Sequence, residues 1–480
     1  MHQTPTRTRQ VPVPALLSVL VPAMLLMIVA SDMVNLVLPR MGRDFGASEA
    51  ELAWVVTGFL LVFAVGVPFY GRISDRIGMR TLFAYALAGY AAGSVVSAFA
   101  PTLLVLVAGR VLTGAGAAAI PVLSVIAVTR LVPPGRRGTG IGFISAASGV
   151  GTAAGPAVGG GLGQALGWHG LFLVTAGCAV LLIPAAVRLL PADAPGDDRP
   201  FDIAGGVLLG LAAGLLLLGV TLAQGAGFTA PSALGSLVGA VAAGALFVRR
   251  TRRARHPFVD PAMFANRVYS AATGTVLLAM LVNLTALVFV PVMLVDANGL
   301  TPGGGALVMI PGGIAFAVVS PLVGRLVPRV GAGNLTVAGL AAMALSMLAL
   351  SFLAGAPPVG TAVVVLCLDL GFAFAATSLT DLAAGALPPA QVGVGLGLFQ
   401  GAQFLGAGAG PAVVGALIAA RQHAGTALNP WYSLAAPAYS DAFLVLAGVA
   451  VLAVVVALRL RSAARTDVAD PAATPSPTRT

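Results

Sequence analysis

The sequence of 480 residues lacks lysine altogether, and its only glutamates are Glu49 and Glu51. Charged residues make up 9% of the chain, whereas a soluble protein of this size carries about 25%. With so little charge, the chain cannot cover a globular surface with hydrated groups. Hydrophobic residues make up 58% of it, so the composition predicts an integral membrane protein.

Residues that bind metals or attack substrates are also few. The two cysteines, Cys178 and Cys367, lie inside apolar runs and are expected to be small packing residues rather than a disulfide or a metal site. The four histidines are scattered along the chain, and there is no phosphate-binding loop and no nucleophile triad. The sequence therefore predicts no metal, no cofactor, no nucleic-acid partner and no enzyme. Without an ATP site, an ion gradient would drive any active process.

Long apolar runs are what the sequence does contain, and a membrane-spanning helix needs about 20 such residues. The first run is too long for the core of a signal peptide, so it is predicted to be a retained span. We expect fourteen spans, at 13–37, 52–70, 81–99, 102–129, 139–162, 171–190, 203–223, 231–248, 270–293, 303–324, 334–354, 359–380, 391–419 and 441–460.

The placement of arginine predicts the orientation. If the N-terminus is cytoplasmic, 22 of the 26 basic residues fall on the cytoplasmic side. Only Arg40, Arg43 and Arg421 fall outside, and Arg110 lies within a span. Because cytoplasmic loops of membrane proteins are rich in arginine, both termini are predicted to be cytoplasmic. The basic run 249–255 follows a span on that side, which favours contact with anionic lipid over nucleic acid.

The chain repeats itself at an offset of about 255 residues. Three motifs occur twice, at 71–78 and 324–331, at 138–142 and 393–397, and at 155–160 and 410–415. Duplicated bundles of membrane helices that face each other are the architecture of transporters. The sequence thus predicts an all-α integral membrane protein made of two six-helix bundles related by an internal repeat, plus two inserted helices.

The repeat also predicts how the chain is divided. The C-terminal end is rich in proline, threonine and alanine, a composition typical of disorder. The expected segments are a cytoplasmic N-terminal tail (1–12), the first bundle (13–190), a linker with the two inserted helices (191–248), a basic cytoplasmic loop (249–269), the second bundle (270–462) and a disordered cytoplasmic tail (463–480).

The turn between the second and third spans carries a dense motif, formed by Gly71, Asp75, Arg76, Gly78 and Arg80. The glycines allow a tight reversal, and the carboxylate can accept from helix amides or pair with an arginine. We interpret the motif as a conformational latch that breaks during a working cycle. The alternative is an ordinary capped turn flanked by positive charge. The second copy has proline in place of the aspartate, so only one latch would be complete.

The fifth span carries a glycine motif made of Gly151, Gly155, Pro156, Gly159 and Gly160. A spacing of four residues puts three of these glycines on one helix face, and the proline bends the helix. The motif predicts close helix packing. A flexible or leak-preventing seam is an equally good interpretation.

Ionisable residues inside the membrane are the strongest candidates for a functional pathway. Arg110 and Asp369 lie near mid-depth on spans that the repeat relates, and Asp32 lies with Asn35 in the outer part of the first span. These four residues are predicted to line a proton or substrate pathway. The alternatives are a structural ion pair, a snorkelling arginine and a polar helix end. Three more aspartates fall at span ends, where they are expected to contact water: Asp296, Asp381 and Asp441.

Several of these motifs together resemble the major facilitator superfamily. The turn 71–80 resembles its loop signature, 110–117 the fourth-helix motif of its drug/proton antiporters, and 151–160 their fifth-helix antiporter motif. The stretch 32–39 followed by Trp54 resembles their first-helix motif.

The two extra helices resemble the fourteen-helix branch of these antiporters. The flanking stretches 201–203 and 257–261 are similar to those of its tetracycline exporters. Those exporters carry membrane carboxylates in two helices, whereas the matching stretches here, 151–154 and 405–408, have none. This difference argues against a metal–tetracycline complex as the substrate.

The resemblance implies a proton-driven exporter of small amphipathic organic compounds or antibiotics, acting by alternating access in the plasma membrane. Its partners would be a small-molecule substrate, protons and the lipid bilayer, and it would work as a monomer, with Asp32 or Asp369 carrying the proton. One alternative is a dedicated exporter of one endogenous metabolite, lipid or siderophore. Others are an importer, a non-transporting sensor, and an antiporter-like subunit of a redox proton pump, which the lack of lysine and intramembrane glutamate disfavours.

Overall fold

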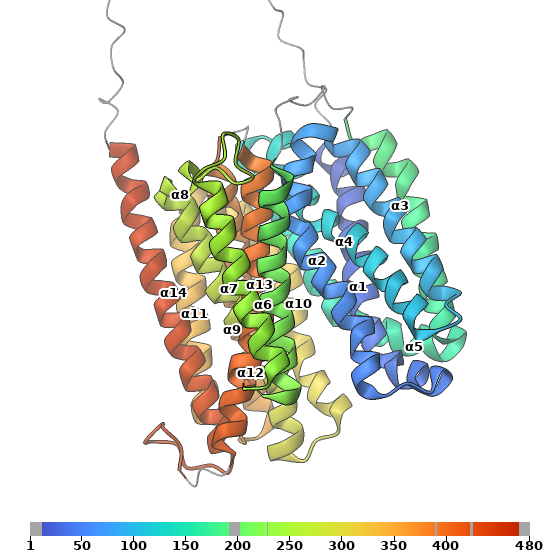
Figure 1. The fold of residues 1–480 in the computed structure, drawn as a ribbon. Helices are drawn as coiled ribbons and strands as arrows, with labels where there is room; N and C mark the ends of the chain where they lie inside the picture. Colours follow the sequence, from blue (N-terminus) through green and yellow to red (C-terminus); the bar gives the residue numbers. More distant parts are fainter. Residues whose placement is uncertain (1–11, 192–201, 228, 389–390, 423–425, 470–480) are drawn as a thin grey trace, which may run out of the picture.

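The computed structural model describes residues 12–191, 202–227, 229–388, 391–422 and 426–469, and the regular elements within them are all helices (Figure 1). The helices are α1 (Val13–Phe45), α2 (Glu49–Ile77), α3 (Met79–Ala98), α4 (Leu103–Leu131), α5 (Pro134–Leu189), α6 (Ile203–Ala226), α7 (Pro231–Thr251), α8 (Ala262–Ala265), α9 (Arg267–Asn298), α10 (Pro302–Val330), α11 (Ala332–Leu353), α12 (Pro358–Gly385), α13 (Val392–Arg421) and α14 (Pro437–Ala469).

Short polar side chains begin several of these helices at the ends of the apolar runs. Ser48 and Glu51 form a capping box at α2, in which the Glu51 carboxylate accepts a hydrogen bond from the Ser48 amide at 2.9 Å. Thr102, Asn266 and Thr301 accept from first-turn amides of α4, α9 and α10. The caps allow tight turns, so consecutive helices run in opposite directions through the bundle.

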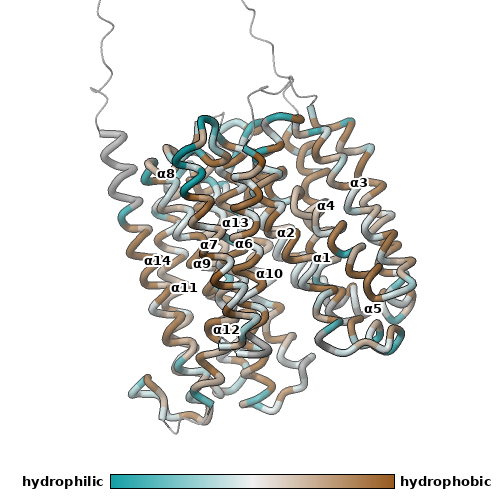
Figure 2. The backbone as a smooth tube through the Cα atoms, viewed as in Figure 1, coloured by the Kyte–Doolittle hydropathy of each residue, from teal (hydrophilic) through white to brown (hydrophobic). Residues whose placement is uncertain are grey.

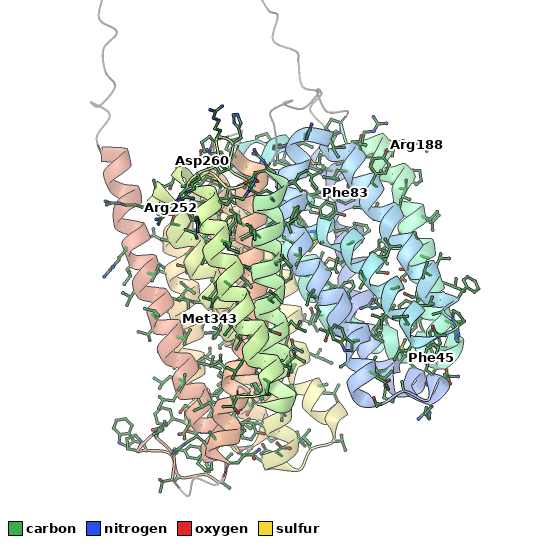
Figure 3. The ribbon with its side chains drawn as sticks, viewed as in Figure 1. Phe45, Phe83, Arg188, Arg252, Asp260 and Met343 are labelled. Carbon is green, nitrogen blue, oxygen red and sulfur yellow. The ribbon has the colours of Figure 1, made fainter. Side chains whose placement is uncertain are left out.

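The long helix α5 holds the break between two predicted spans. Gly167 has φ 67° and ψ 177°, a conformation outside the helical range that glycine adopts readily. The next residue, Trp168, packs against Phe45 at the end of α1, with the ring centroids 5.6 Å apart and the rings tilted by 50°. Arg188, near the end of α5, lies at the other end of the molecule (Figure 3). The second half of α5 therefore runs in the opposite direction to the first.

Thirteen segments of the described residues are long and apolar enough to cross a membrane, against the fourteen spans predicted. The difference lies in α5, where Gly161–Leu189 is one such segment and the predicted span 139–162 has no segment of its own. No loop separates the two halves of α5, since only Gly167 interrupts the helix. The all-helical, multi-pass membrane fold agrees with the prediction.

The helices before and after the inserted pair form two groups, which lie on opposite sides of the view in Figure 1. In the first group, α5 packs on α1 and α3, and α4 packs on α2 and α3. In the second group, α11 packs on α12 and α14, and α9 packs on α13 and α14. The two groups meet along two main seams, one between α2 and α13 and the other between α5 and α10.

The inserted helices α6 and α7 pack on each other outside the two groups. A stripe of glycines on α6 faces α2: a Cβ placed on Gly210 would lie 2.6 Å from Val65, and one on Gly206 would lie 2.8 Å from Phe69. On another face of α6, Leu217 contacts Gly408 of α13. The helix α6 thus touches both sides of the α2–α13 seam. In α7 only 17% of the span is buried, so this helix faces lipid.

The two ends of the bundle differ in charge. We call the upper end in Figure 1, where α2, α7 and α10 end and α3 begins, the arginine-rich end, because Arg76, Arg252 and Arg329 lie there. The helix α1 begins and α14 ends at this same end. Figure 2 shows hydrophilic residues gathered there and in the loops of the opposite end, with hydrophobic residues between them.

Two expectations about local structure were wrong. Cys178 and Cys367 are exposed on their helices rather than packed inside, because a cysteine on a lipid-facing surface needs no partner. The tail predicted to be disordered from residue 463 is helical up to Ala469. Its first residues continue α14, because adding a residue to an existing helix costs little. Residues 470–480, and 1–11 of the N-terminal tail, lie outside the described residues.

Candidate functional site

A cavity of about 270 Å³ lies between the two helix groups, and every one of its walls comes from helices of the repeated units. The first group contributes α1, α2, α4 and α5, and the second contributes α9, α10, α12 and α13. No described side chain of either inserted helix lines it. This position on the axis between two related bundles is where transport proteins of duplicated architecture bind their cargo.

Aromatic rings form much of the cavity wall. Phe63 meets Phe404 edge to face, with centroids 4.7 Å apart, and Phe316 stacks on Phe372 at 5.5 Å. Phe63 and Phe316 occupy equivalent positions in the repeat, at an offset of 253. The wall thus offers flat, polarisable surfaces from both groups, which suit an aromatic or amphipathic guest.

Asp32 is the one charged side chain among the described residues that line the cavity. The uncharged polar groups around it include Ser31, Ser145 and Thr152, with Gln400 and Gln403 from α13. Among the described residues no ion pair neutralises Asp32, and a carboxylate in a membrane cavity favours a cation or a proton. The two glutamines were missed by the sequence analysis. Their signal is two amide side chains close together inside an otherwise apolar span.

The glycine motif of α5 seats α1, and with it Asp32. A Cβ placed on Gly155 would lie 2.9 Å from Cβ of Asp32, and one on Gly151 would lie 2.9 Å from Cβ of Ile28. Gly159 makes the same kind of close approach to Met33. The prediction of close helix packing is therefore confirmed at these three glycines, and the partner is the helix that carries the cavity carboxylate.

Some predicted site residues are described only as part of the backbone. Asn35 lies in α1, Pro156 and Gly160 lie in α5, and Asp75 lies in α2, but their side-chain surroundings fall outside the described structure. The roles predicted for them stay predictions.

Arg110 lies behind the cavity wall rather than in it. Its side chain is 2% exposed, and its Nε donates a hydrogen bond of 3.1 Å to the carbonyl oxygen of Val55. Its guanidinium lies 4.3 Å from the centroid of the Phe59 ring, and Phe59 lines the cavity. Arg110 therefore contacts the back of the cavity wall at Phe59, by a cation–π contact.

Asp369 is held inside the second group. Asn283 of α9 donates a hydrogen bond of 3.1 Å to Asp369 Oδ1, and a Cβ on Gly312 of α10 would lie 3.1 Å from its Cγ. Asp369 is not among the described residues that line the cavity, and no described ion pair joins it to Arg110. The structure thus leaves the two membrane charges, predicted at similar depth, on separate groups with separate partners.

The latch motif lies at the arginine-rich end, where α2 turns into α3. Gly78 carries φ 92° and ψ 145° at the turn, as its predicted reversal requires. Arg76 is exposed and Arg80 is half-buried. Gly71 packs against the main chain of α13, since a Cβ placed on it would lie 3.1 Å from Cα of Gly397 and closer still to the carbonyl of Gly393.

The repeat reproduces this contact on the other seam. A Cβ placed on Gly138 of α5 would lie 2.7 Å from the carbonyl oxygen of Gly324 of α10. Gly324 is the repeat counterpart of Gly71, and Gly138 is the counterpart of Gly393. Each copy of the latch glycine therefore touches the glycine motif of the other copy. These crossed contacts require glycine at the four positions, because a side chain would lie between the two backbones.

Further contacts extend both seams at the same end. Gly397 approaches Pro68 on one seam, and Gly142 approaches Pro321, the repeat counterpart of Pro68, on the other. An electrostatic interaction between Asp381 of α12 and Arg137 of α5 also joins the groups.

Further along the same helices, towards the opposite end, the glycines turn to partners in their own group. Gly155 meets Asp32 of α1, and Gly410 meets Leu281 and Thr285 of α9. In this structure the two groups are thus closed against each other at the arginine-rich end.

Two other aspartates predicted at span ends have defined partners. Asp296 is exposed and accepts a hydrogen bond from the Tyr439 hydroxyl. Asp441 is fully buried, which contradicts the expected contact with water. It pairs with Arg421 at 2.7 Å and accepts from the Leu428 amide at 2.6 Å, because the segment before α14 folds back over it.

A membrane protein with a cavity between two repeat-related bundles is, by its architecture, a transporter. The chain belongs to the Major Facilitator Superfamily, whose family profile matches residues 20–411. This is a family of transporters rather than enzymes. Among the described residues, no group of three His, Cys, Asp or Glu side chains is placed to hold a metal ion.

Drug exporters are among its relatives. It is 31% identical over 391 residues to the multidrug resistance protein Stp of Mycobacterium tuberculosis, covering 81% of this chain and 72% of the relative. It is 33% identical over 424 residues to the tetracenomycin C resistance and export protein of Streptomyces glaucescens, covering 88% and 78%.

Solved structures share the fold at low identity. The human organic anion transporter MFSD10 matches with a TM-score of 0.66 and 17% identity, over 93% of this chain and 99% of that one. The proton:xylose symporter XylE matches with a TM-score of 0.65 and 16% identity, over 93% and 95%.

Proposed function

We propose that the protein is a proton-driven exporter of small amphipathic organic compounds, acting by alternating access in the plasma membrane. The observation that carries this proposal is the cavity between the two groups, in which Asp32 is the one charged side chain described. The printed names of two relatives, a multidrug resistance protein and a tetracenomycin C export protein, support export as the direction.

The arrangement in the membrane follows from charge. In this proposal the arginine-rich end is cytoplasmic, as the positive-inside bias favours, and both termini lie there. The two halves of α5 each cross the membrane, so the chain has fourteen spans. The first bundle (13–190) and the second bundle (270–462) are the moving bodies, and the inserted pair lies between them in sequence.

The proton would be carried by Asp32. It faces the cavity, whereas Asp369 is enclosed by α9, α10 and α12. Protonation of Asp32 from outside would neutralise the cavity and release a bound cation or polar group. Reopening towards the cytoplasm would then let the proton leave and the next substrate enter. One charge moved through about 100 mV supplies about 2.3 kcal/mol, enough for a gradient of roughly fortyfold.

The remaining motif residues would serve the conformational change. The crossed glycine contacts Gly71–Gly393 and Gly138–Gly324 would form when the cytoplasmic end closes and part when it opens. The latch residues Asp75 and Arg76, with Gly78 and Arg80, would stabilise the closed end. The packing of α5 on α1 would transmit the movement to the carboxylate.

The cavity wall suggests the substrate class. Five phenylalanines from both groups line it, with serine, threonine and glutamine side chains between them. A flat aromatic compound with few polar groups, either neutral or cationic, fits this surface. An anionic substrate would be repelled by the Asp32 carboxylate, which has no described ion pair to neutralise it. The protein would act as a monomer, because each wall of the cavity comes from the same chain.

The test is directional transport of one aromatic cation. Ethidium would be loaded into cells that express the protein, and its loss would be followed after energising with glucose. The proposal expects cells with the wild-type protein to lose ethidium faster than cells with Asp32→Asn. A protonophore should abolish this difference. Accumulation of ethidium on energising would indicate an importer.

Two results together would favour a dedicated metabolite exporter over a drug exporter. No aromatic compound from a broad panel would be transported, and a strain without the gene would no longer secrete one particular compound. The similarity to a protein named for export of a single antibiotic makes this second candidate worth the comparison.

A further inference from the structure

The inserted helix pair carries two grooves at the arginine-rich end that the transport cycle does not use. The first lies between α6 and α7 and is lined by Leu208, Leu246, Arg249, Arg250, Arg253 and Ala254, with a volume of about 390 Å³. The second lies along the other side of α7 and has a volume of about 650 Å³. Its lining comprises Val241, Gly244, Ala245, Val248, Arg249, Arg252 and Arg253.

The two grooves share their basic end. Arg249 in the last turn of α7 and Arg253 in the turn that follows the helix line both grooves, while the rest of each lining is mostly apolar. We propose that this is a binding site for one anionic phospholipid, whose phosphate lies between Arg249 and Arg253 and whose two acyl chains occupy the two grooves. Arginine binds phosphate oxygens through paired N–H groups, and a phospholipid joins two chains at one phosphate.

The charges at the site match an anion. Arg250 is already neutralised, because its Nε lies 2.7 Å from Asp202, the residue that caps α6. Arg249, Arg252 and Arg253 are exposed, and no described ion pair gives them a carboxylate. Counted over the residues that the structure describes, the site therefore has a surplus of positive charge beside lipid-facing apolar surface.

The location selects lipid over other phosphate compounds. The helix α7 has little burial, and Val238 and Val241 are 66% and 74% exposed on it. Acyl chains of the leaflet are thus in contact with α7 along its length. Basic pockets beside membrane helices recognise anionic headgroups in this way. A free phosphate would use the arginines and leave both grooves empty.

The site lies on a helix pair that reaches across the two moving bodies. Asp202 ties α7 to the start of α6, and α6 contacts α2 through Gly210 and α13 through Leu217. A lipid that bridges the grooves would hold α7 against α6 beside the α2–α13 seam. The other seam, between α5 and α10, has no inserted helix among its described contacts.

The test measures lipid retention by the purified full-length protein with native mass spectrometry. The protein in neutral detergent would be titrated with phosphatidylglycerol or with phosphatidylcholine of the same chains. We expect one phosphatidylglycerol to bind at least tenfold more tightly than phosphatidylcholine. The double variant Arg249→Gln/Arg253→Gln should lower the affinity for phosphatidylglycerol by about thirtyfold. Each basic residue at a membrane surface contributes on the order of 1 kcal/mol to binding.

Two controls separate the site from general charge. The variant Arg188→Gln/Arg329→Gln removes the same charge from exposed positions at the same end and should leave binding unchanged. Ala245→Trp fills the second groove but keeps both arginines. It should weaken binding of the lipid without affecting binding of inorganic phosphate.

Equal affinity for the two lipids would overturn the proposal. An equal loss of lipid affinity in Arg249→Gln/Arg253→Gln and in Arg188→Gln/Arg329→Gln would also overturn it. Displacement of the lipid by millimolar inorganic phosphate alone would do the same.

Discussion

Gly138 of α5 and Gly324 of α10 meet backbone to backbone, so close that a Cβ on Gly138 would lie 2.7 Å from the Gly324 carbonyl oxygen. The same relationship, with the repeats exchanged, joins Gly71 to Gly393 on the other seam. The closed arginine-rich end is thus built from one pair of motifs used twice. In the proposed cycle these contacts must form and part at every turnover.

A side chain at this contact should hold the bundles apart. Gly138→Leu should favour the state open at the arginine-rich end by roughly ten- to hundredfold, because overpacking costs about 1–3 kcal/mol. In a background without Cys178 and Cys367, a cysteine at the cavity residue Ser145 should react faster with a thiol reagent added from that end. Transport should fall accordingly.

The control for this variant lies in the same helix. A Cβ on Gly135 would meet nothing within 4 Å, so Gly135→Leu should change neither reactivity nor transport. Equal effects of the two substitutions would mean that the seam is not what the leucine disturbs.

The contact between Gly155 and Asp32 predicts a sensitive position for coupling. Gly155→Ala should push on the carboxylate and lower proton-coupled transport by about tenfold or more. Gly161→Ala serves as the matched control, because it makes the same change in the same helix where nothing lies within 4 Å. Transport rates in vesicles at fixed pH gradient check this, and identical rates for both variants would contradict it.

Arg110 should affect substrate binding through Phe59 rather than directly. Arg110→Gln and Phe59→Leu should each weaken binding of an aromatic substrate, and the double variant should be little worse than either single one. The coupling between them should be about 0.5–2 kcal/mol, the range of a cation–π contact. A dye-binding titration of the four proteins gives this value, and strictly additive losses would show that the two side chains act separately.

The pair formed by the partly exposed Arg421 and the buried Asp441 should stabilise the segment before α14. Arg421→Gln leaves the Asp441 charge buried without its partner, and should cost about 3 kcal/mol of unfolding free energy. The double variant Arg421→Gln/Asp441→Asn should recover part of that loss. Thermal unfolding in detergent measures both, and a double variant less stable than Arg421→Gln would be inconsistent with a charge-pairing role.

Much of the fold could be predicted from the sequence, because long apolar runs and a repeated motif are local patterns. The recurrence of 71–78 and 138–142 predicted duplicated bundles, and the four-residue glycine spacing in α5 predicted close packing. The break at Gly167 falls between the predicted spans 139–162 and 171–190, but the sequence could not show that a single glycine rather than a loop would separate the two helical runs.

Contacts between distant segments were beyond the sequence. Depth along a helix is readable from residue number, so Arg110 and Asp369 could be identified as membrane charges. Their partners depend on helix rotation and on which bundle faces which, and they turned out to be Phe59 and Asn283. Asp441 was mispredicted for the same reason, since its cover comes from a segment that folds back in space.

The most direct test of the account is proton coupling at Asp32 against Asp369. Inside-out vesicles would carry a proton gradient reported by a pH-sensitive dye, and an aromatic cation would be added to wild type, Asp32→Asn and Asp369→Asn. The account predicts substrate-induced proton release in wild type and in Asp369→Asn, and none in Asp32→Asn. Proton release that persists in Asp32→Asn, or is lost only in Asp369→Asn, would contradict it.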